Sequence, residues 1–187
     1  MAVNSAAVGV AITGALHRGA SGATAPTSTS SALTGYTELG WISEDGVTRS
    51  HPDAGDATAI VGWQNGQQIR VIRKPSTENP TYGCVLLETT KATIEASLGV
   101  TVTQTSTEGS YVLDTSVIRP KDKWVLDVID GPELERHYIP QGEVVALGDV
   151  VYKNDEPIGY EITIEAHRDA TLGGQVKVFS TRLKTPA

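Results

Sequence analysis

The stretch PIGYEITIEAHRD (Pro157–Asp169) alternates between two kinds of side chain. One set is apolar and the other is mostly polar: Ile158, Tyr160, Ile162, Ile164 and Ala166 against Gly159, Glu161, Thr163, Glu165 and His167. Successive side chains of a β-strand point to opposite faces of its sheet, so this period of two predicts a strand with one buried face and one wet, acidic face. Such a strand must pair with others, which makes the chain a β-protein.

Several other segments share this texture of Val, Ile, Thr and aromatic residues: QQIRVIRK (67–74), KWVLDVIDG (123–131), GEVVALGDVVY (142–152) and QVKVFST (175–181). Within them we expect two further buried faces, one with Ile69 and Val71 and the other with Trp124, Leu126 and Val128. Turn-forming residues separate the segments, as at Gly131–Pro132 and Asn154–Asp155. About ten short strands of this kind predict an antiparallel β-sandwich or barrel.

One segment, LETTKATIEASLG (Leu87–Gly99), has no turn signal and spaces Ile94 and Leu98 four residues apart. Thr89 or Thr90 is suited to the N-cap of a helix, and Gly99 stands where a helix C-terminus favours glycine. We therefore predict one substantial α-helix over residues 89–98, lying on the flank of the sheets.

The N-terminal 35 residues differ from the rest of the chain. Residues 17–35, HRGASGATAPTSTSSALTG, consist mainly of Gly, Ala, Ser and Thr and have no large apolar anchor. Such a segment cannot bury enough surface to fold by itself. We expect residues 1–35 to form an extended arm that becomes ordered on assembly, and residues 36–187 to form one β-domain. The first residues have an apolar middle without a preceding Lys or Arg, which is not typical of a signal peptide.

Composition excludes several classes of function. The chain has 187 residues, a net charge of −7 and a single cysteine, Cys84. One cysteine cannot form an intramolecular disulfide, and no apolar run reaches the roughly 20 residues of a membrane helix. An acidic chain without Lys and Arg clusters is unsuited to wrapping nucleic acid, because phosphate binding requires cations.

The motifs of common enzymes are also absent or incomplete. GVAITGAL has the glycine spacing of a phosphate loop but places Ala15 where lysine is required. AHRDATLGG contains His-Arg-Asp, but Gly174 stands where a kinase has its metal-binding asparagine. Cys84 lies in an apolar segment that keeps a thiol protonated. The four histidines have no metal-like spacing, so we expect no catalytic site, metal or cofactor.

The stretch LGWISEDGVTRS (Leu39–Ser50) raises a choice between a carboxylate pair and a structural turn. Asp45–Gly46 between two strand-like runs predicts a two-residue hairpin, in which Glu44 and Arg49 become diagonal neighbours. Asp45 then belongs to the turn and does not converge with Glu44 on a metal or substrate. The polar run that follows suggests that residues 43–62 project as a charged loop, which typically meets a partner. The candidate contact residues are Trp41, Glu44, Asp45, Arg49, Asp53 and Asp56.

Several of these segments together resemble the major tail tube proteins of phages with long, non-contractile tails that infect actinobacteria. They are LGWISEDGVTRS, DATAIVGWQNGQQIRVIRK and CVLLETTKATIEASLG, followed by the C-terminal half from WVLDVIDG to EITIEAHRD. The resemblance covers roughly Gly35 to Thr181 and rests on the order and spacing of these segments, because none is diagnostic alone. It is weakest in the N-terminal arm and in PSTENPTYG (75–83).

The resemblance implies a structural virion protein: a β-sandwich subunit with one flanking helix, assembled in the host cytoplasm into stacked hexameric rings. The implied partners are other copies of the chain, a tape measure protein in the lumen, and terminator and distal tail proteins at the tube ends. The phage DNA passes through without specific binding and no membrane is involved. A carboxylate-lined lumen repels phosphates, so Glu161 and Glu165 are candidates for a lumen-facing row.

Other classes of protein share parts of this pattern. A phage adhesion or capsid-decoration module would also be a β-sandwich, but as a stable monomer that needs no assembly arm. A small hydrolase on a jelly-roll scaffold would require a converging histidine and carboxylate set, for which the sequence offers no candidates. A tail terminator has a related fold, although a long projecting loop suits a subunit that repeats along the tube.

Overall fold

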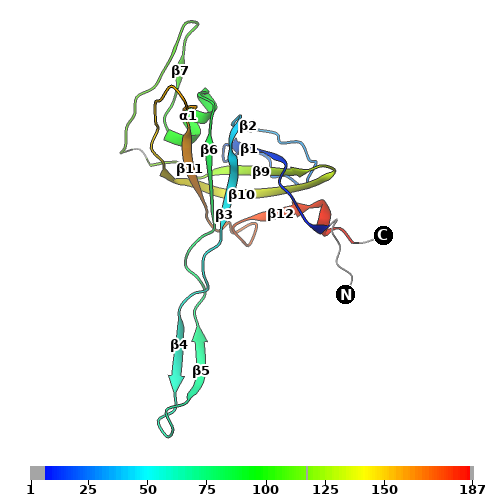
Figure 1. Cartoon of the computed structure of the whole chain (residues 1–187), viewed down its shortest axis with the longest axis vertical. Coiled ribbons are helices and arrows are strands. Elements are labelled where there is room, and N and C mark those ends of the chain that lie inside the picture. Colours follow the sequence, from blue (N-terminus) through cyan, green and yellow to red (C-terminus); the bar gives the residue numbers. More distant parts are fainter. Residues whose placement is uncertain (1–6, 117, 186–187) are drawn as a thin grey trace.

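The chain folds into a β-sandwich whose two layers share one long strand, β10 (Glu133–Leu147) (Figure 1). The computed structural model describes residues 7–116 and 118–185. In the first layer, the N-terminal half of β10 pairs with β9 (Asp122–Asp130) on one side and β12 (Lys177–Ser180) on the other. Next to β9 lie β1 (Thr13–Gly19) and then β2 (Tyr36–Glu38), all antiparallel.

The second layer begins where β10 bends. Its C-terminal half, from Gly142 to Leu147, pairs with β11 (Tyr160–Ala166). Then follow β6 (Thr81–Leu86) and β3 (Ile42–Ser50), again antiparallel. Figure 1 shows β9 and β10 crossing the direction of β3, β6 and β11, so the two layers pack across one another with the core between them.

The apolar faces predicted for β11 and β9 form much of this core. Tyr160, Ile162, Ile164 and Ala166 of β11 are buried, as are Trp124 and Leu126 of β9, while Val128 is half-buried against them. The predicted fold class, a mainly β antiparallel sandwich with one flanking α-helix, is therefore confirmed. Two smaller elements are a hairpin whose strands have two residues each, β7 (Thr103–Gln104) and β8 (Gly109–Ser110), and a short 3-10 helix (Thr181–Leu183).

The helix α1 (Lys91–Leu98) forms as the capping residues predict. The Oγ1 of Thr90 accepts a hydrogen bond from the backbone N–H of Thr93 at 3.2 Å, which satisfies one of the free donors of the first turn. Gly99 ends the helix in the left-handed region, with a φ of 70°. Ile94 is buried in the core and Leu98 is packed at its edge, which places the helix on the sandwich flank.

The bend in β10 depends on a glycine. The indole of Trp124 lies directly against Gly142, where a Cβ atom would otherwise stand, and its Nε1–H donates to the Gly142 carbonyl at 3.2 Å. We predict that Gly142→Ala lowers the free energy of unfolding by about 1–3 kcal/mol, because the added methyl group overpacks a rigid site. Urea denaturation measures the change. Gly174→Ala is the control, since its added methyl group meets nothing within 4 Å; equal losses in the two variants would contradict the prediction.

The N-terminal 35 residues do not form the separate arm that we expected. Residues 13–19 are β1, a strand between β2 and β9, and Leu16 of this strand is fully buried. Residues 20–35 lie over the outer face of the first layer, where Lys123 donates to the carbonyl of Ala23 at 2.7 Å. The domain boundary at residue 35 was therefore wrong: low-complexity sequence is ordered here by hydrogen bonds from its own subunit.

The predicted hairpin at Asp45–Gly46 is also wrong. β3 runs as one strand along β6, with Ile42 opposite Leu86 and Val47 opposite Cys84. The extra residues on β3 form a wide bulge, and Gly46 supplies its positive φ of 68°. An Asp-Gly pair fits such a bulge as well as a hairpin turn, because both need a left-handed residue.

The projecting element begins later than residues 43–62 suggested. β4 (Ala57–Val61) and β5 (Gln68–Arg73) pair only with each other and form a long hairpin beyond the end of β3 (Figure 1). The alternation in residues 67–74 predicted one buried face for β5, but every residue of β5 is exposed. The pattern was right for a strand and wrong for burial, because no second layer covers this hairpin among residues 7–116 and 118–185.

Candidate functional site

The β4–β5 hairpin is a long element whose apolar side chains are uncovered among the described residues. Its exposed hydrophobic side chains are Ile60, Val61, Trp63, Ile69, Val71 and Ile72, and Trp63 at the tip is 95% exposed. An isolated two-stranded hairpin is at best marginally stable in water. Exposed apolar side chains in this number mark an interaction surface, so the hairpin is the first candidate for a functional contact.

The tip of this hairpin is built by its Gly and Asn residues. Gly66 has a φ of 67°, and its N–H donates to the carbonyl of Gly62 at 2.9 Å. The Asn65 side-chain oxygen accepts from the N–H of Gln67 at 3.0 Å. These local bonds close the turn without help from the body, so the chain presents Trp63 in a defined place.

A groove on the body is the second candidate surface. It has a volume of about 600 Å³ and lies between the bulge of β3 and the start of β1, with β9 at its floor. Its apolar lining residues include Ile12, Trp41, Ile42, Val47, Leu126 and Val128, and its acidic ones are Glu38, Glu44, Glu88 and Asp127. The groove therefore combines apolar walls with carboxylates, the composition expected for a basic, apolar partner.

The rim of the groove is held by the residues around Trp41. The N–H of Trp41 donates to the Glu88 carboxylate at 3.0 Å, and its carbonyl accepts from the N–H of Leu87 at 2.9 Å. Gly40, with a φ of 79°, packs so closely on Glu88 that a side chain would collide with it. The indole of Trp41 remains 76% exposed, so it is presented to the outside and is not a core residue.

The six predicted contact residues do not form one site. Trp41 and Glu44 line the groove together, and Asp45 is exposed beside them on the bulge. Arg49 lies at the other end of β3, where its guanidinium donates to His137, and it does not pair with Glu44. The remaining two predicted residues are exposed at the root of the hairpin: Asp53 and Asp56.

The two lumen candidates, Glu161 and Glu165, lie on the polar face of β11, opposite the core face. Glu165 stands opposite Glu143 of β10 in the sheet register. Asn79 donates to the Glu165 carboxylate at 2.7 Å, and the His167 ring lies 3.1 Å from the Glu143 carboxylate. This face is therefore acidic but partly neutralised at one end.

A buried ion pair holds residues 20–35 in place, and no pattern in the sequence indicates it. Arg136 is 6% exposed and binds both carboxylate oxygens of Asp127, at 2.6 and 2.7 Å. Its third nitrogen donates to the carbonyl of Ser31 at 2.7 Å and reaches that of Ser28 at 3.3 Å. Arg136 lies outside the strands predicted from the sequence, and only the pairing of β9 with β10 brings it to Asp127.

His137 occupies a second buried polar cluster. Its Nδ1 accepts hydrogen bonds from Arg49 at 3.3 Å and Tyr82 at 3.2 Å, and its Nε2 lies 2.7 Å from Glu135. Because an arginine can only donate, this geometry fits the neutral ring with its proton on Nε2. Burial lowers the pKa of His137 below the ordinary value of 6.5, although Glu135 opposes the shift.

This pKa shift predicts a pH-dependent stability. The unfolded chain binds the His137 proton at about 6.5, while the folded chain binds it only at lower pH, so the free energy of unfolding falls as the pH drops below about 6.5. The slope from this group is at most about 1.4 kcal/mol per pH unit. Urea denaturation between about pH 7.5 and 5.5 measures it, and we expect a shallower slope for His137→Gln. An unchanged slope would contradict the assignment, and His51→Gln, at an exposed position, is the matched control.

The described residues hold little that could support catalysis. Cys84 is buried, and burial raises the pKa of its thiol to about 12, so it is a core residue. Among residues 7–116 and 118–185, no group of three or more His, Cys, Asp or Glu side chains is placed to hold a metal ion. In the same ranges, no helix is long and apolar enough to cross a membrane.

The sequence contains a local signal for the β4–β5 hairpin. Residues 57–74 carry Arg70, Arg73 and Lys74 without any acidic residue, in a chain that is otherwise acidic. Two short β-rich runs flank GWQNGQ, a turn-forming tip. A basic, apolar hairpin on an acidic protein is recognisable from these letters, whereas the groove forms from β1, β3 and β9 and has no local signature.

A β-sandwich with a long uncovered hairpin and a groove lined by carboxylates has two surfaces suited to contacts with other proteins. A protein-family model described as phage tail tube protein matches residues 1–182. The chain therefore belongs to the phage tail tube protein family. As a member, it is a structural protein of the virion tail that assembles with itself and other tail proteins into a tube. A search of curated proteins found no match.

Proposed function

We propose that this chain forms stacked hexameric rings that build the tail tube of a phage with a long, non-contractile tail and an actinobacterial host. The role is structural and not enzymatic: the tube is the conduit through which the genome is delivered. The observation that carries the proposal is the β4–β5 hairpin, whose apolar side chains are uncovered within the subunit. In a tube, a neighbouring ring covers them.

The edges of the sheet support ring closure. β2 and β3 stand at the two ends of the strand order, so each has one side without a partner strand among the described residues. An exposed strand edge invites pairing with another chain, and a closed ring satisfies every edge with the next copy. Residues 7–12, which expose Val8, Val10 and Ile12, are a further contact that becomes covered on assembly.

The polar face of β11 suits the lumen. Glu161 is exposed and Glu165 is half-buried beside Glu143, so the face carries carboxylates toward solvent. Carboxylates repel DNA phosphates and release no counterions on contact, so DNA slides past such a wall without binding. The same lumen holds the tape measure protein before ejection. Assembly takes place in the host cytoplasm, and terminator and distal tail proteins close the tube ends.

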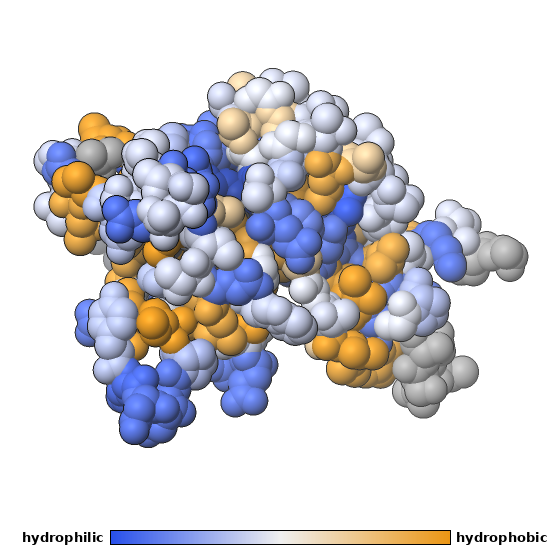
Figure 2. Space-filling model, turned by 90° about the horizontal axis from the view of Figure 1, so that it is seen from above, coloured by the Kyte–Doolittle hydropathy of each residue, from blue (hydrophilic) through white to orange (hydrophobic). Residues whose placement is uncertain are grey.

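A second apolar surface fits a contact within or between rings. Exposed hydrophobic side chains gather on one side of the body, in two loops and at the end of β10: Tyr111, Val112, Leu113, Ile118, Val145, Leu147, Val151 and Tyr152. Figure 2 shows hydrophobic surface on the left of the molecule, where Figure 1 places these loops. Arg119 donates to the Val144 carbonyl at 3.3 Å and ties the first of these loops to β10.

Negative-stain electron microscopy of the purified chain, dilute and concentrated, tests the proposal. We expect hollow tubes or rings with six-fold end views at high concentration. Compact monomers at every concentration, also after the addition of the other tail proteins, would contradict it and favour an adhesion or capsid-decoration module.

A further inference from the structure

The β4–β5 hairpin differs in charge from the rest of the chain. Residues 57–74 contribute +3 to a chain whose net charge is −7, so the remainder carries −10. None of Arg70, Arg73 and Lys74 forms a salt bridge with any residue that the structure describes. Together with Trp63, they make the hairpin a basic and apolar element without a partner in its own subunit.

The groove beside Trp41 has the complementary properties. Its carboxylates Glu38, Glu44 and Glu88 form no salt bridge within the described residues, whereas Asp127 is neutralised by Arg136. Its volume of about 600 Å³ lies in the range of sites that bury several side chains. The apolar walls match the Ile and Trp side chains of the hairpin, and the free carboxylates match its cations.

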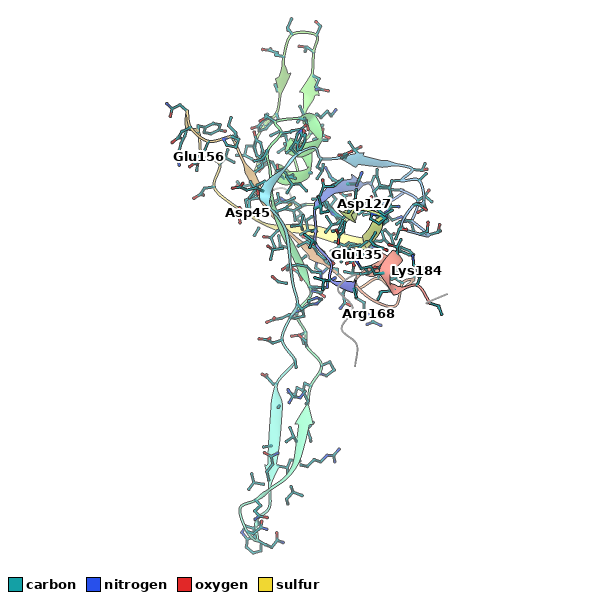
Figure 3. All side chains as sticks on the ribbon, turned by 45° about the vertical axis from the view of Figure 1, so that its right-hand side comes forward. Asp45, Asp127, Glu135, Glu156, Arg168 and Lys184 are labelled. Atoms are coloured by element: carbon teal, nitrogen blue, oxygen red, sulfur yellow. The ribbon has the colours of Figure 1, made fainter. Side chains whose placement is uncertain are left out.

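The two surfaces face in different directions along β3. The groove borders the first half of this strand, and the hairpin leaves from its other end. Figure 3 shows Asp45 on the body and the hairpin extending away from it. From residue 51 to the tip at residue 65, an extended chain spans about 45 Å. The hairpin therefore points away from its own groove and can reach a second molecule.

We propose that the β4–β5 hairpin of one copy docks in the groove of a second copy, with Trp63 against the Trp41 wall and Arg70 and Arg73 beside Glu38 and Glu44. The hairpin and the groove are different surfaces, so a pair of docked copies still has one free hairpin and one free groove. The same contact can therefore repeat in a head-to-tail series. Exposed Trp and Arg side chains are the residue types that carry most binding energy in interfaces. The inference rests on the proposed self-assembly and names the receiving site.

Charge reversal tests the inference. We expect the donor variant Arg70→Glu/Arg73→Glu and the acceptor variant Glu38→Lys/Glu44→Lys each to form at least about tenfold less sedimentable tube than the wild type, because like charges then face each other. Both sets combined in one chain should restore assembly to near the wild-type level. All four side chains are exposed, so circular dichroism should show an unchanged fold. The control Glu78→Lys/Glu108→Lys makes the same charge change at exposed positions outside the groove.

The outcomes separate the inference from the proposed function. Suppose that wild-type tubes form, but the acceptor variant assembles equally well or the combined variant does not recover assembly. The docking inference is then wrong, while the proposed tail tube function still stands. If the wild type itself forms no rings or tubes, both are wrong. A mixture of the donor and acceptor variants should also recover assembly, since the hairpin of each variant is opposite in charge to the groove of the other.

Cross-linking tests the same contact directly. We expect a chain with Gln64→Cys at the hairpin tip and Glu44→Cys in the groove to give a ladder of covalent oligomers with a short bismaleimide reagent, because Cys84 is buried and does not compete. Gln64→Cys with Glu108→Cys is the matched control. A ladder of equal intensity in the control would overturn the inference.

Discussion

Replacing residues 57–74 by a short Gly-Ser linker is expected to abolish tube formation and leave the body as stable as before. The N–H of Lys74 donates to the carbonyl of Asp56 at 3.0 Å, so the two ends of the hairpin lie side by side and a short linker joins them without strain. None of the hairpin residues belongs to the buried core. The deletion therefore removes the uncovered apolar surface and little of the folding energy.

Two measurements check this expectation. Electron microscopy and sedimentation should show monomers at concentrations at which the wild type forms tubes, and urea denaturation should show a free energy of unfolding within about 0.5 kcal/mol of the wild-type monomer. Replacing the β7–β8 turn, residues 105–108, by the same linker is the control. Tubes of normal length from the hairpin deletion would contradict the role of the hairpin in assembly.

The variant Arg136→Ala is expected to lower the free energy of unfolding by about 3–5 kcal/mol, because it leaves Asp127 as an unpaired charge in a largely buried place. It also removes the donors to the carbonyls of Ser28 and Ser31. Residues 20–35 lose their main attachment to the first layer, so the N-terminal covering should open even where the sandwich stays folded.

Urea denaturation and amide hydrogen exchange measure the two effects separately. We expect the double variant Arg136→Met/Asp127→Leu to recover much of the lost stability, since a buried ion pair is often replaceable by apolar side chains. The backbone amides of residues 20–35 should nevertheless exchange faster than in the wild type. Arg168→Ala, at an exposed position, is the control for loss of an arginine. Slow exchange of residues 20–35 in Arg136→Ala would show that other contacts hold the segment.

The sequence predicts which face of a strand is buried when that strand lies over the core. The alternation of residues 157–169 matches the buried and exposed faces of β11. The same reasoning failed for β5, which alternates in sequence but is exposed on both faces. Periodicity reports the pleat of a strand, while burial depends on whether another layer lies above it. The part of the chain that the structure describes supplies no such layer for β5, and in the proposed tube the layer belongs to another copy.

Capping and turn residues predicted the local backbone conformation correctly, but they did not predict which strands pair around it. Thr90 and Gly99 cap α1 as predicted, because a cap needs only residues within one turn. Gly46 adopts its positive φ, yet it forms a bulge and not a hairpin, since β3 pairs with β6 both before and after Gly46. Residues 20–35 are bound by Arg136 and Lys123 of their own chain, and composition alone does not reveal these contacts.

The sequence by itself determined the class of the fold, the place of the helix and the absence of a recognisable catalytic motif. These depend on side-chain period, capping residues and residue spacing, which are local properties. Only the tertiary structure decided that β1 joins the sheet, that Arg136 meets Asp127, and that Trp41 and Glu44 share a groove with Ile12. Each of these joins residues far apart in sequence, and such contacts arise from strand pairing across the whole sandwich.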